Sequence, residues 1–267
     1  RFLPGKKRAN AVLVSNDQTK SLLPQDLTGK VYNNILESGV DLSNFRITKK
    51  YIPKALNSYN LPVNYVFVGR LVDWKGVTHL LNAFKEVSDS IDSRLHLVGD
   101  GVLKTALETQ AESLGIKNKV QFTGWMNHSE IMTFLTRCDV FVMPSLRESG
   151  GNAILEAMAL GLPVIVTNWG GPGRIVNDSC GIRVNPDSPK EFERGLAEAM
   201  VELGRSPRMQ YELGMAGRKR CSSEYFDWDT KTDLIIEIFK ECILHEQEQS
   251  QSSPLSEANL ALYSKSE

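Results

Sequence analysis

The chain has few cysteines, no long apolar run and almost no net charge. Its four cysteines lie far apart, without a Cys-x-x-Cys pair or a histidine at metal-ligand spacing. That pattern is typical of reduced core thiols in a cytoplasmic protein and argues against a disulfide framework or a zinc site. No apolar run approaches the ~20 residues of a transmembrane helix. A formal net charge of −1 argues against a general nucleic-acid binder.

What is present is a regular alternation of apolar strands and amphipathic helical patterns. Short apolar runs predict strands at Tyr65–Val68, Leu95–Val98, Val120–Phe122, Val140–Met143, Val164–Thr167 and Ile182–Val184. Because helical patterns separate these runs, the sequence predicts an α/β fold with a Rossmann-like, doubly wound parallel sheet. Ligands of such sheets bind outside the carboxyl ends of the strands, so the residues after each strand are the candidates for a site.

The most informative stretch follows the fourth predicted strand. The polar loop Leu146–Asn152 contains the pair Gly150 and Gly151, which would let the backbone approach a ligand closely. Asn152 is predicted as the N-cap of a helix over Ala153–Leu160. The first N–H groups of that helix, at residues 153–155, would lack intrahelical partners and favour an anion.

Two carboxylates flank this predicted anion site. Glu156 lies on the first turn of a helix that is apolar on every face, so its carboxylate would need hydrogen-bond donors. Glu148 lies on the preceding loop. Together they predict a ligand that carries both phosphates and hydroxyls, as a nucleotide sugar does. The alternative is that Glu156 only complements the helix N-terminus and that Glu148 is solvated, because Glu-x7-Glu alone is a weak pattern.

Cations follow the first predicted strand. In the segment Gly69–Gly76, Arg70 and Lys75 straddle a turn, where a guanidinium fork and an ammonium point charge could converge on phosphates. The alternative is that Arg70 caps or pairs locally and that Lys75 is solvated. The residues alone do not decide between the two.

The other strand ends carry weaker candidates. Asp100 is expected to serve the local backbone of a Gly-Asp-Gly turn, and Arg174 could reach a phosphate or form a structural salt bridge. Trp125 is expected to cover the edge of the sheet. His128 is expected to be a surface residue beside a helix whose predicted N-cap is Ser129.

The block from Glu148 to Glu156, followed by AMALGLPVI, resembles the Glu-x7-Glu signature of the GT4 family of glycosyltransferases, which have the GT-B architecture of two facing Rossmann-like domains. The resemblance covers roughly Ala11 to Leu244. It implies a retaining hexosyltransferase that moves a sugar from a nucleoside-diphosphate sugar to an acceptor, with this chain as mainly the C-terminal, donor-binding half. The glycine pair after Ser149 replaces the commoner Gly-Phe-Gly, so the contacts to the sugar differ in detail.

The resemblance also implies a role for each candidate. Arg70 and Lys75 would bind the donor diphosphate and neutralise the leaving group, and Glu156 would hold the ribose hydroxyls. Glu148 would bind the donor sugar near the reacting carbon. Backbone contacts would come from Gly150, Gly151, Asn152, Ala153 and, for the nucleobase, Met126. No cofactor or metal is expected, because these cations and the helix terminus supply the charge and the chain has no Asp-x-Asp motif.

The resemblance further implies an order of domains. Residues 1–40 would be a remnant of the first GT-B domain, 41–62 a linker, and 63–223 the nucleotide-sugar-binding domain. Residues 224–245 would form a helix that crosses back to the first domain, which is otherwise largely missing, and 246–267 a disordered tail. The basic group Lys6, Lys7 and Arg8 could face the inner membrane surface or a lipid-linked acceptor, or form an ordinary solvated face.

Two other functions are compatible with the sequence. A nucleotide-sugar epimerase of GT-B architecture would need further catalytic groups on the first domain. A non-catalytic nucleotide-sugar-binding module would need none.

Overall fold

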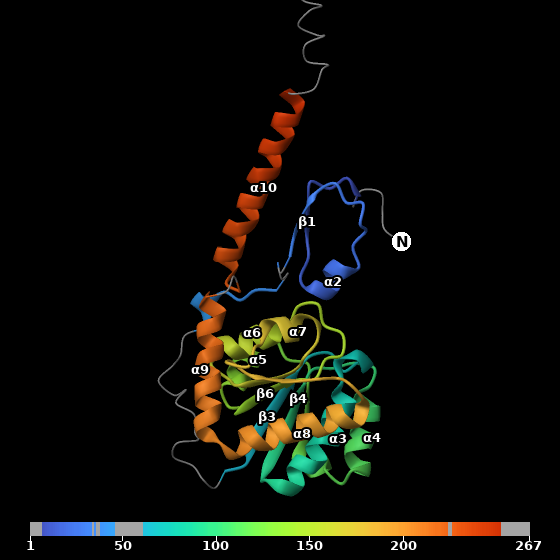
Figure 1. The fold of residues 1–267 in the computed structure, drawn as a ribbon. Coiled ribbons are helices and arrows are strands. Elements are labelled where there is room, and N and C mark those ends of the chain that lie inside the picture. The colour runs from blue at the N-terminus through green and yellow to red at the C-terminus, as the bar shows by residue number, and fades with distance from the viewer. Residues whose placement is uncertain (1–6, 34, 36–37, 46–60, 224–225, 252–267) are drawn as a thin grey trace, which may run out of the picture. The chain divides into compact units, whose positions relative to one another are not determined.

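The computed structural model describes residues 7–33, 35, 38–45, 61–223 and 226–251 (Figure 1). Lys6, most of the predicted linker and residues 252–267 of the predicted tail lie outside the described residues. The chain divides into two compact units, one of Arg1–Ile35 with Asp229–Glu267, the other of Leu36–Trp228. Each is described by itself.

The smaller unit contains a pair of short strands and a long helix. β1 (Ala11–Leu13) pairs in parallel with β2 (Lys30–Tyr32), and the short helix α2 (Asp17–Ser21) connects them. Helix α10 (Trp228–Gln251) meets this pair through Glu241, which accepts hydrogen bonds from the Tyr32 hydroxyl at 2.6 Å and from the Lys30 ammonium at 3.0 Å. The helix continues to Gln251, into the segment that the sequence predicted to be disordered.

The larger unit is built on a six-stranded sheet in which every pairing is parallel. Its strands are β3 (Val63–Val68), β4 (Ser93–Val98), β5 (Val120–Gly124), β6 (Val140–Met143), β7 (Val164–Thr167) and β8 (Ile182–Val184). Its helices are α3 (Val77–Ser90), α4 (Lys104–Ser113), α5 (His128–Leu135), α6 (Asn152–Ala159), α7 (Gly170–Ile175), α8 (Pro189–Arg205) and α9 (Pro207–Ser223). The predicted fold class and the six predicted strands are confirmed.

The order of the strands is β5-β4-β3-β6-β7-β8. From β3 the chain proceeds outward to β4 and β5, and from β6 it proceeds outward in the opposite direction to β7 and β8. Right-handed crossovers therefore place α3 and α4 on one face of the sheet and α6 and α7 on the other. The packing agrees, since α3 contacts α4 and α8, whereas α6 contacts α7 and α9. The strand order reverses between β3 and β6, and a reversal of this kind opens a crevice at the carboxyl ends of the two strands.

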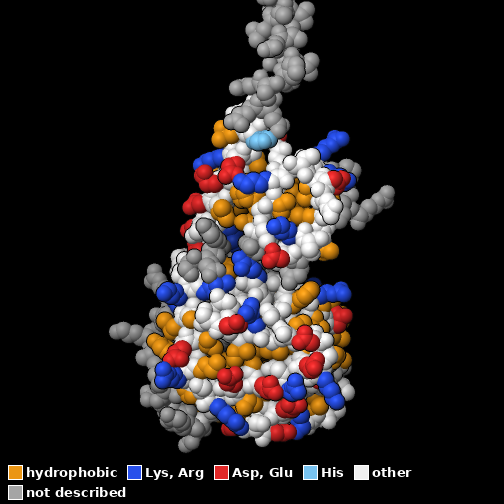
Figure 2. Space-filling view, in the orientation of Figure 1, with side chains coloured by type: hydrophobic (Ala, Val, Ile, Leu, Met, Phe, Trp, Pro, Cys, Tyr) orange, Lys and Arg blue, Asp and Glu red, His pale blue; other side chains and the backbone are white. Residues whose placement is uncertain are grey.

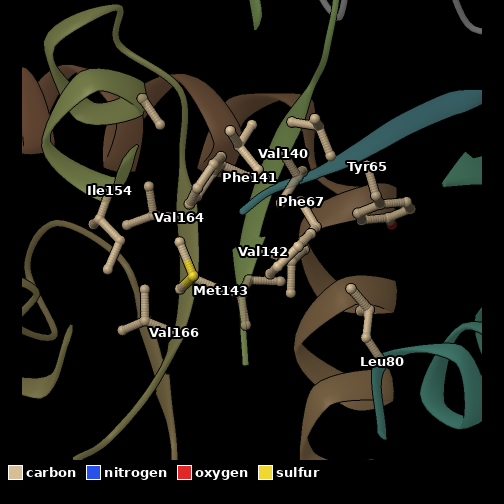
Figure 3. Packing of buried hydrophobic residues seen from close by; sticks show 14 of the residues in the cluster. Tyr65, Phe67, Leu80, Val140, Phe141, Val142, Met143, Ile154, Val164 and Val166 are labelled. Atoms are coloured by element: carbon tan, nitrogen blue, oxygen red, sulfur yellow. The ribbon is translucent and has the colours of Figure 1, made fainter. Parts of the chain in front are cut away.

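The core that fixes these strand ends is apolar and closely packed. Tyr65 and Phe67 of β3 face the same side of the sheet as Val140 of β6, whereas Phe141 faces the other side, and all four side chains are fully buried (Figure 3). The hydroxyl of Tyr65 donates a 2.6 Å hydrogen bond to the carbonyl of Met200, which ties β3 to α8. Burial raises the pKa of this hydroxyl well above its usual range, so it stays protonated as a donor.

The cysteines behave as the sequence predicted. Cys138, Cys180 and Cys221 are buried free thiols, and Cys242 is a half-buried one. Burial raises the pKa of Cys221 to about 12, so this thiol is not a nucleophile at neutral pH. On the face of the larger unit seen in Figure 2, acidic and basic side chains are mixed, in agreement with the near-zero net charge.

Candidate functional site

The three loops that follow β3, β6 and β7 are joined by backbone hydrogen bonds at the carboxyl ends of these strands. The loop after β6 is held from one side by its Leu146 N–H, which donates to the carbonyl of Trp74 at 2.8 Å. It is held from the other side by the N–H of Gly171, which donates to the carbonyl of Glu148 at 2.8 Å. The backbone that carries Glu148 is thereby fixed between the β3 loop and the β7 loop.

Glycines make this close approach possible. Gly76 has a φ of 67°, and a Cβ there would collide with the carbonyl oxygen of Pro144. A Cβ at Gly171 would collide with the carbonyl oxygens of Ser149 and Gly150. Side chains at either position would push the loops apart.

Lys75 and Glu148 form an ion pair across the reversal of the strand order. Lys75 ends the short 3₁₀ helix Asp73–Lys75 after β3, and its Nζ contacts Oε2 of Glu148 on the loop after β6. Their side chains are only 16% and 18% exposed, respectively. The pair is largely shielded from water, so each side chain would be left without a partner if the other were removed and no ligand replaced it. The alternative of a solvated Lys75 and a solvated Glu148 is wrong.

Arg70 is placed differently from Lys75. Its side chain is exposed, and its guanidinium lies 5.9 Å from the centroid of the Trp74 ring, within cation–π range. The described part of the chain offers it no ion-pair partner. The guanidinium is therefore held over an aromatic face with its hydrogen-bond donors available to an anion.

The start of α6 differs from the prediction by one residue. Asn152 is the first helical residue, and the N-cap is Gly151, whose φ of 137° favours glycine. The carbonyl of Gly151 accepts from the N–H groups of Ile154 at 2.9 Å and Leu155 at 3.2 Å, so these two are not free. Within the described residues, the N–H groups of Asn152 and Ala153 have no acceptor. The candidate anion site at this terminus thus consists of two N–H groups, one residue earlier than predicted.

Glu156 is 19% exposed and has the donor that its position requires. His128 Nε2 lies 3.1 Å from Oε1 of Glu156. His128 is a largely exposed residue, as expected, but its contact with Glu156 was missed by the sequence analysis. It opens α5, whose N-cap is Asn127 and not Ser129, because Asn127 and Glu130 form a capping box.

A pocket of about 440 Å³ lies beside the β5 exit. It is lined by Trp125, Met126, Ser129, Glu130, Thr133, Phe134 and Arg137. Trp125 is 76% exposed, so the expectation that it covers the sheet edge is wrong. Met126 is half-buried and packs against the core.

Asp100 and Arg174, two of the weaker candidates, lie at other strand ends. Asp100 accepts a 2.7 Å hydrogen bond from the N–H of Gly101, as expected for a tight turn. Arg174, on α7, is exposed and has no ion-pair partner in the described part of the chain, so of its two predicted roles the structural salt bridge is not found there. Among the described residues, no group of three His, Cys, Asp or Glu side chains could hold a metal ion. No helix in that part of the chain has the length and apolar character needed to cross a bilayer.

Comparison with known proteins gives consistent matches. Residues 49–219 match the family model described as glycosyl transferases group 1. An uncharacterised glycosyltransferase of Methanocaldococcus jannaschii is 28% identical over 218 residues, which cover 81% of this chain and 55% of that protein. The chain thus spans about half the length of this relative.

Solved structures share the fold. Anabaena HepE, in complex with UDP and glucose, superposes with a TM-score of 0.71 at 22% identity, over 88% of this chain and 64% of that one. The C-terminal domain of the group 1 glycosyl transferase LpcC from Francisella tularensis gives a TM-score of 0.60 at 23% identity, over 70% of this chain and 98% of that one.

Proposed function

Because the chain belongs to the group 1 glycosyl transferases, the family whose GT4 signature its motifs resemble, we propose that it binds a nucleoside-diphosphate sugar at the carboxyl ends of β3 and β6. The protein transfers that sugar to an acceptor hydroxyl. The observation that carries the proposal is the meeting of Lys75 and Glu148 at the point where the strand order reverses. Crevices at such points are where open α/β sheets bind nucleotides.

Each part of the donor has a matching group on the protein. The diphosphate binds to Lys75, Arg70 and the N–H groups of Asn152 and Ala153, all of which are hydrogen-bond donors with positive or partly positive charge. The ribose hydroxyls donate hydrogen bonds to the carboxylate of Glu156. The sugar binds to Glu148, with close backbone contacts at Gly150 and Gly151. The nucleobase lies against the backbone near Met126.

The chemistry asked of these groups is mainly electrostatic. Transfer breaks the bond between the anomeric carbon and the diphosphate oxygen, while the acceptor oxygen bonds to that carbon and passes its proton to the departing diphosphate. Negative charge grows on the departing diphosphate, and Lys75 and Arg70 are placed to stabilise it. We infer retention of the anomeric configuration from the family signature. The acceptor is a sugar, a lipid-linked saccharide or another hydroxyl compound.

A thermal screen with UDP, GDP and ADP tests the donor site. A nucleoside diphosphate at 100 times its dissociation constant is expected to add ~2.7 kcal/mol to the free energy of unfolding, which a melting curve detects. The matching nucleosides, which lack phosphates, are expected to stabilise far less. If none of the three diphosphates raises the melting temperature, the donor site is lost, and with it the proposed function. Product analysis with a labelled donor then separates transfer from epimerisation.

Replacing Glu148 with glutamine is expected to affect the affinities for a free nucleoside diphosphate and for its glucose conjugate differently. The substitution removes a negative charge and releases Lys75, so the free nucleoside diphosphate should bind about 3- to 10-fold more tightly. The glucose conjugate of the same diphosphate should gain nothing or lose affinity, because a carboxylate that accepts from sugar hydroxyls is gone. Calorimetric titration of both ligands into the variant and the wild type gives the change in each dissociation constant.

The matched control for this variant is Glu112→Gln, which breaks an exposed ion pair with Lys117. It is expected to leave both affinities unchanged. An equal shift of both ligands in Glu148→Gln would mean that Glu148 acts on the phosphates alone and does not contact the sugar.

A further inference from the structure

The carboxylate of Glu156 has one oxygen engaged and one available. Oε1 lies 3.1 Å from Nε2 of His128, and the described residues supply no partner for Oε2. A carboxylate only accepts hydrogen bonds, so Nε2 of His128 carries the hydrogen. A half-buried carboxylate held at one oxygen by a directional donor has a defined orientation, and its second oxygen faces a defined direction.

His128 is itself fixed by the backbone. It is the first residue of α5, directly after an N-cap, Asn127, whose side chain accepts from the N–H of Glu130 at 3.0 Å. The side chain of Glu130 accepts in return from the N–H of Asn127 at 2.8 Å. The imidazole therefore projects from a capped helix start after β5, whereas Glu156 projects from the helix after β6. The hydrogen bond between His128 and Glu156 therefore joins α5 to α6, two helices that follow different strands.

We propose that His128 is a positioning residue for ribose recognition. It holds Oε1 of Glu156 so that Oε2 is oriented to accept from the ribose hydroxyls of the donor. This inference rests on the proposed donor site. His128 is 65% exposed and its bond with Glu156 contributes little to folding, so its effect is expected in ligand selectivity and not in stability.

The test compares a nucleoside diphosphate with its 2′,3′-dideoxy analogue. The diphosphate that binds best among UDP, GDP and ADP is titrated by calorimetry into the wild type, His128→Ala and His128→Gln. In His128→Ala, affinity for the ribose form is expected to fall about tenfold, the effect of one hydrogen bond, while affinity for the dideoxy form changes less than twofold. The ratio of the two affinities, ribose form over dideoxy form, measures discrimination. His128→Gln retains a side-chain N–H donor, so it is expected to recover most of this discrimination.

Two controls separate this inference from the proposed function. His79→Ala removes another histidine–glutamate contact, the 2.7 Å pair with Glu193 between α3 and α8, and is expected to leave discrimination unchanged. Glu156→Ala is expected to abolish discrimination. If the wild type discriminates and His128→Ala discriminates equally well, the inference is overturned while the donor site stands. If the wild type binds no nucleoside diphosphate, the proposed function fails as well.

Discussion

Lys75→Met is expected to weaken binding of the nucleoside diphosphate about 10- to 100-fold, the range given by the loss of one charge-assisted hydrogen bond. The methionine keeps the length of the side chain but removes the cation. It also leaves Glu148, only 18% exposed, without its partner, so a negative charge then faces the position of the phosphates. Both consequences act against the anion. Calorimetric titration of the variant and of the wild type measures the effect.

The ion pair with Glu148 makes this prediction sharper. In the double variant Lys75→Met, Glu148→Gln the unpaired carboxylate is gone, so part of the lost affinity is expected to return. Because Lys75 and Glu148 are in contact, their effects on affinity should not add up in a double-mutant cycle of the wild type, the two single variants and the double variant. Lys85→Met serves as the control because Lys85 pairs with Asp89 on the exposed side of α3. Equal affinities in Lys75→Met and wild type would remove Lys75 from the phosphate site.

Gly76→Ala is expected to lower the free energy of unfolding of the larger unit by about 2–5 kcal/mol, the sum of a left-handed backbone cost and an overpacking cost. The residue has a φ of 67°, and its Cβ would meet the carbonyl oxygen of Pro144 at the end of β6. The same collision would displace the loop that carries Glu148, so diphosphate affinity should fall too.

Gly115→Ala is the matched control for that variant. Gly115 has a similar φ of 71°, but a Cβ there would meet nothing within 4 Å. Its cost is expected to be the backbone term alone, about 1–2 kcal/mol. Chemical denaturation of the two variants therefore isolates the contact with Pro144. Equal costs at the two positions would mean that the β3 and β6 loops are not packed as described.

Much of this site could be read from the sequence because the relevant information is local. A buried parallel strand is a short apolar run, and its carboxyl end is where the run stops. That rule made Arg70, Lys75 and Glu148 candidates, and the resemblance to the GT4 family favoured them over Asp100 and Arg174. The pairing of Lys75 with Glu148 was not predictable in the same way, since it depends on β3 and β6 being neighbours although two strands separate them in the chain.

Two helix N-caps and one side-chain contact differ from the sequence predictions for physical reasons. Asparagine is a common N-cap, but Gly151 adopts a φ of 137° that starts α6 one residue earlier. Asn127 displaced Ser129 as the cap of α5 because it also exchanges hydrogen bonds with Glu130, a reciprocal pattern that sequence spacing allows but does not select. The contact between His128 and Glu156 joins the start of α5 to α6, and its only sequence signal was that each residue lies near the start of a helix that follows a strand.

The central claim is that the loops after β3 and β6 bind the diphosphate of a sugar nucleotide. The most direct test is a titration of the isotopically labelled chain with the best-binding nucleoside diphosphate, followed through its backbone amide resonances. The amides of Asn152 and Ala153 should shift most, with a dissociation constant equal to the calorimetric one, and in Lys75→Met these shifts should need about 10- to 100-fold more ligand. Shifts confined to other surfaces, such as the pocket along α5, would contradict the account.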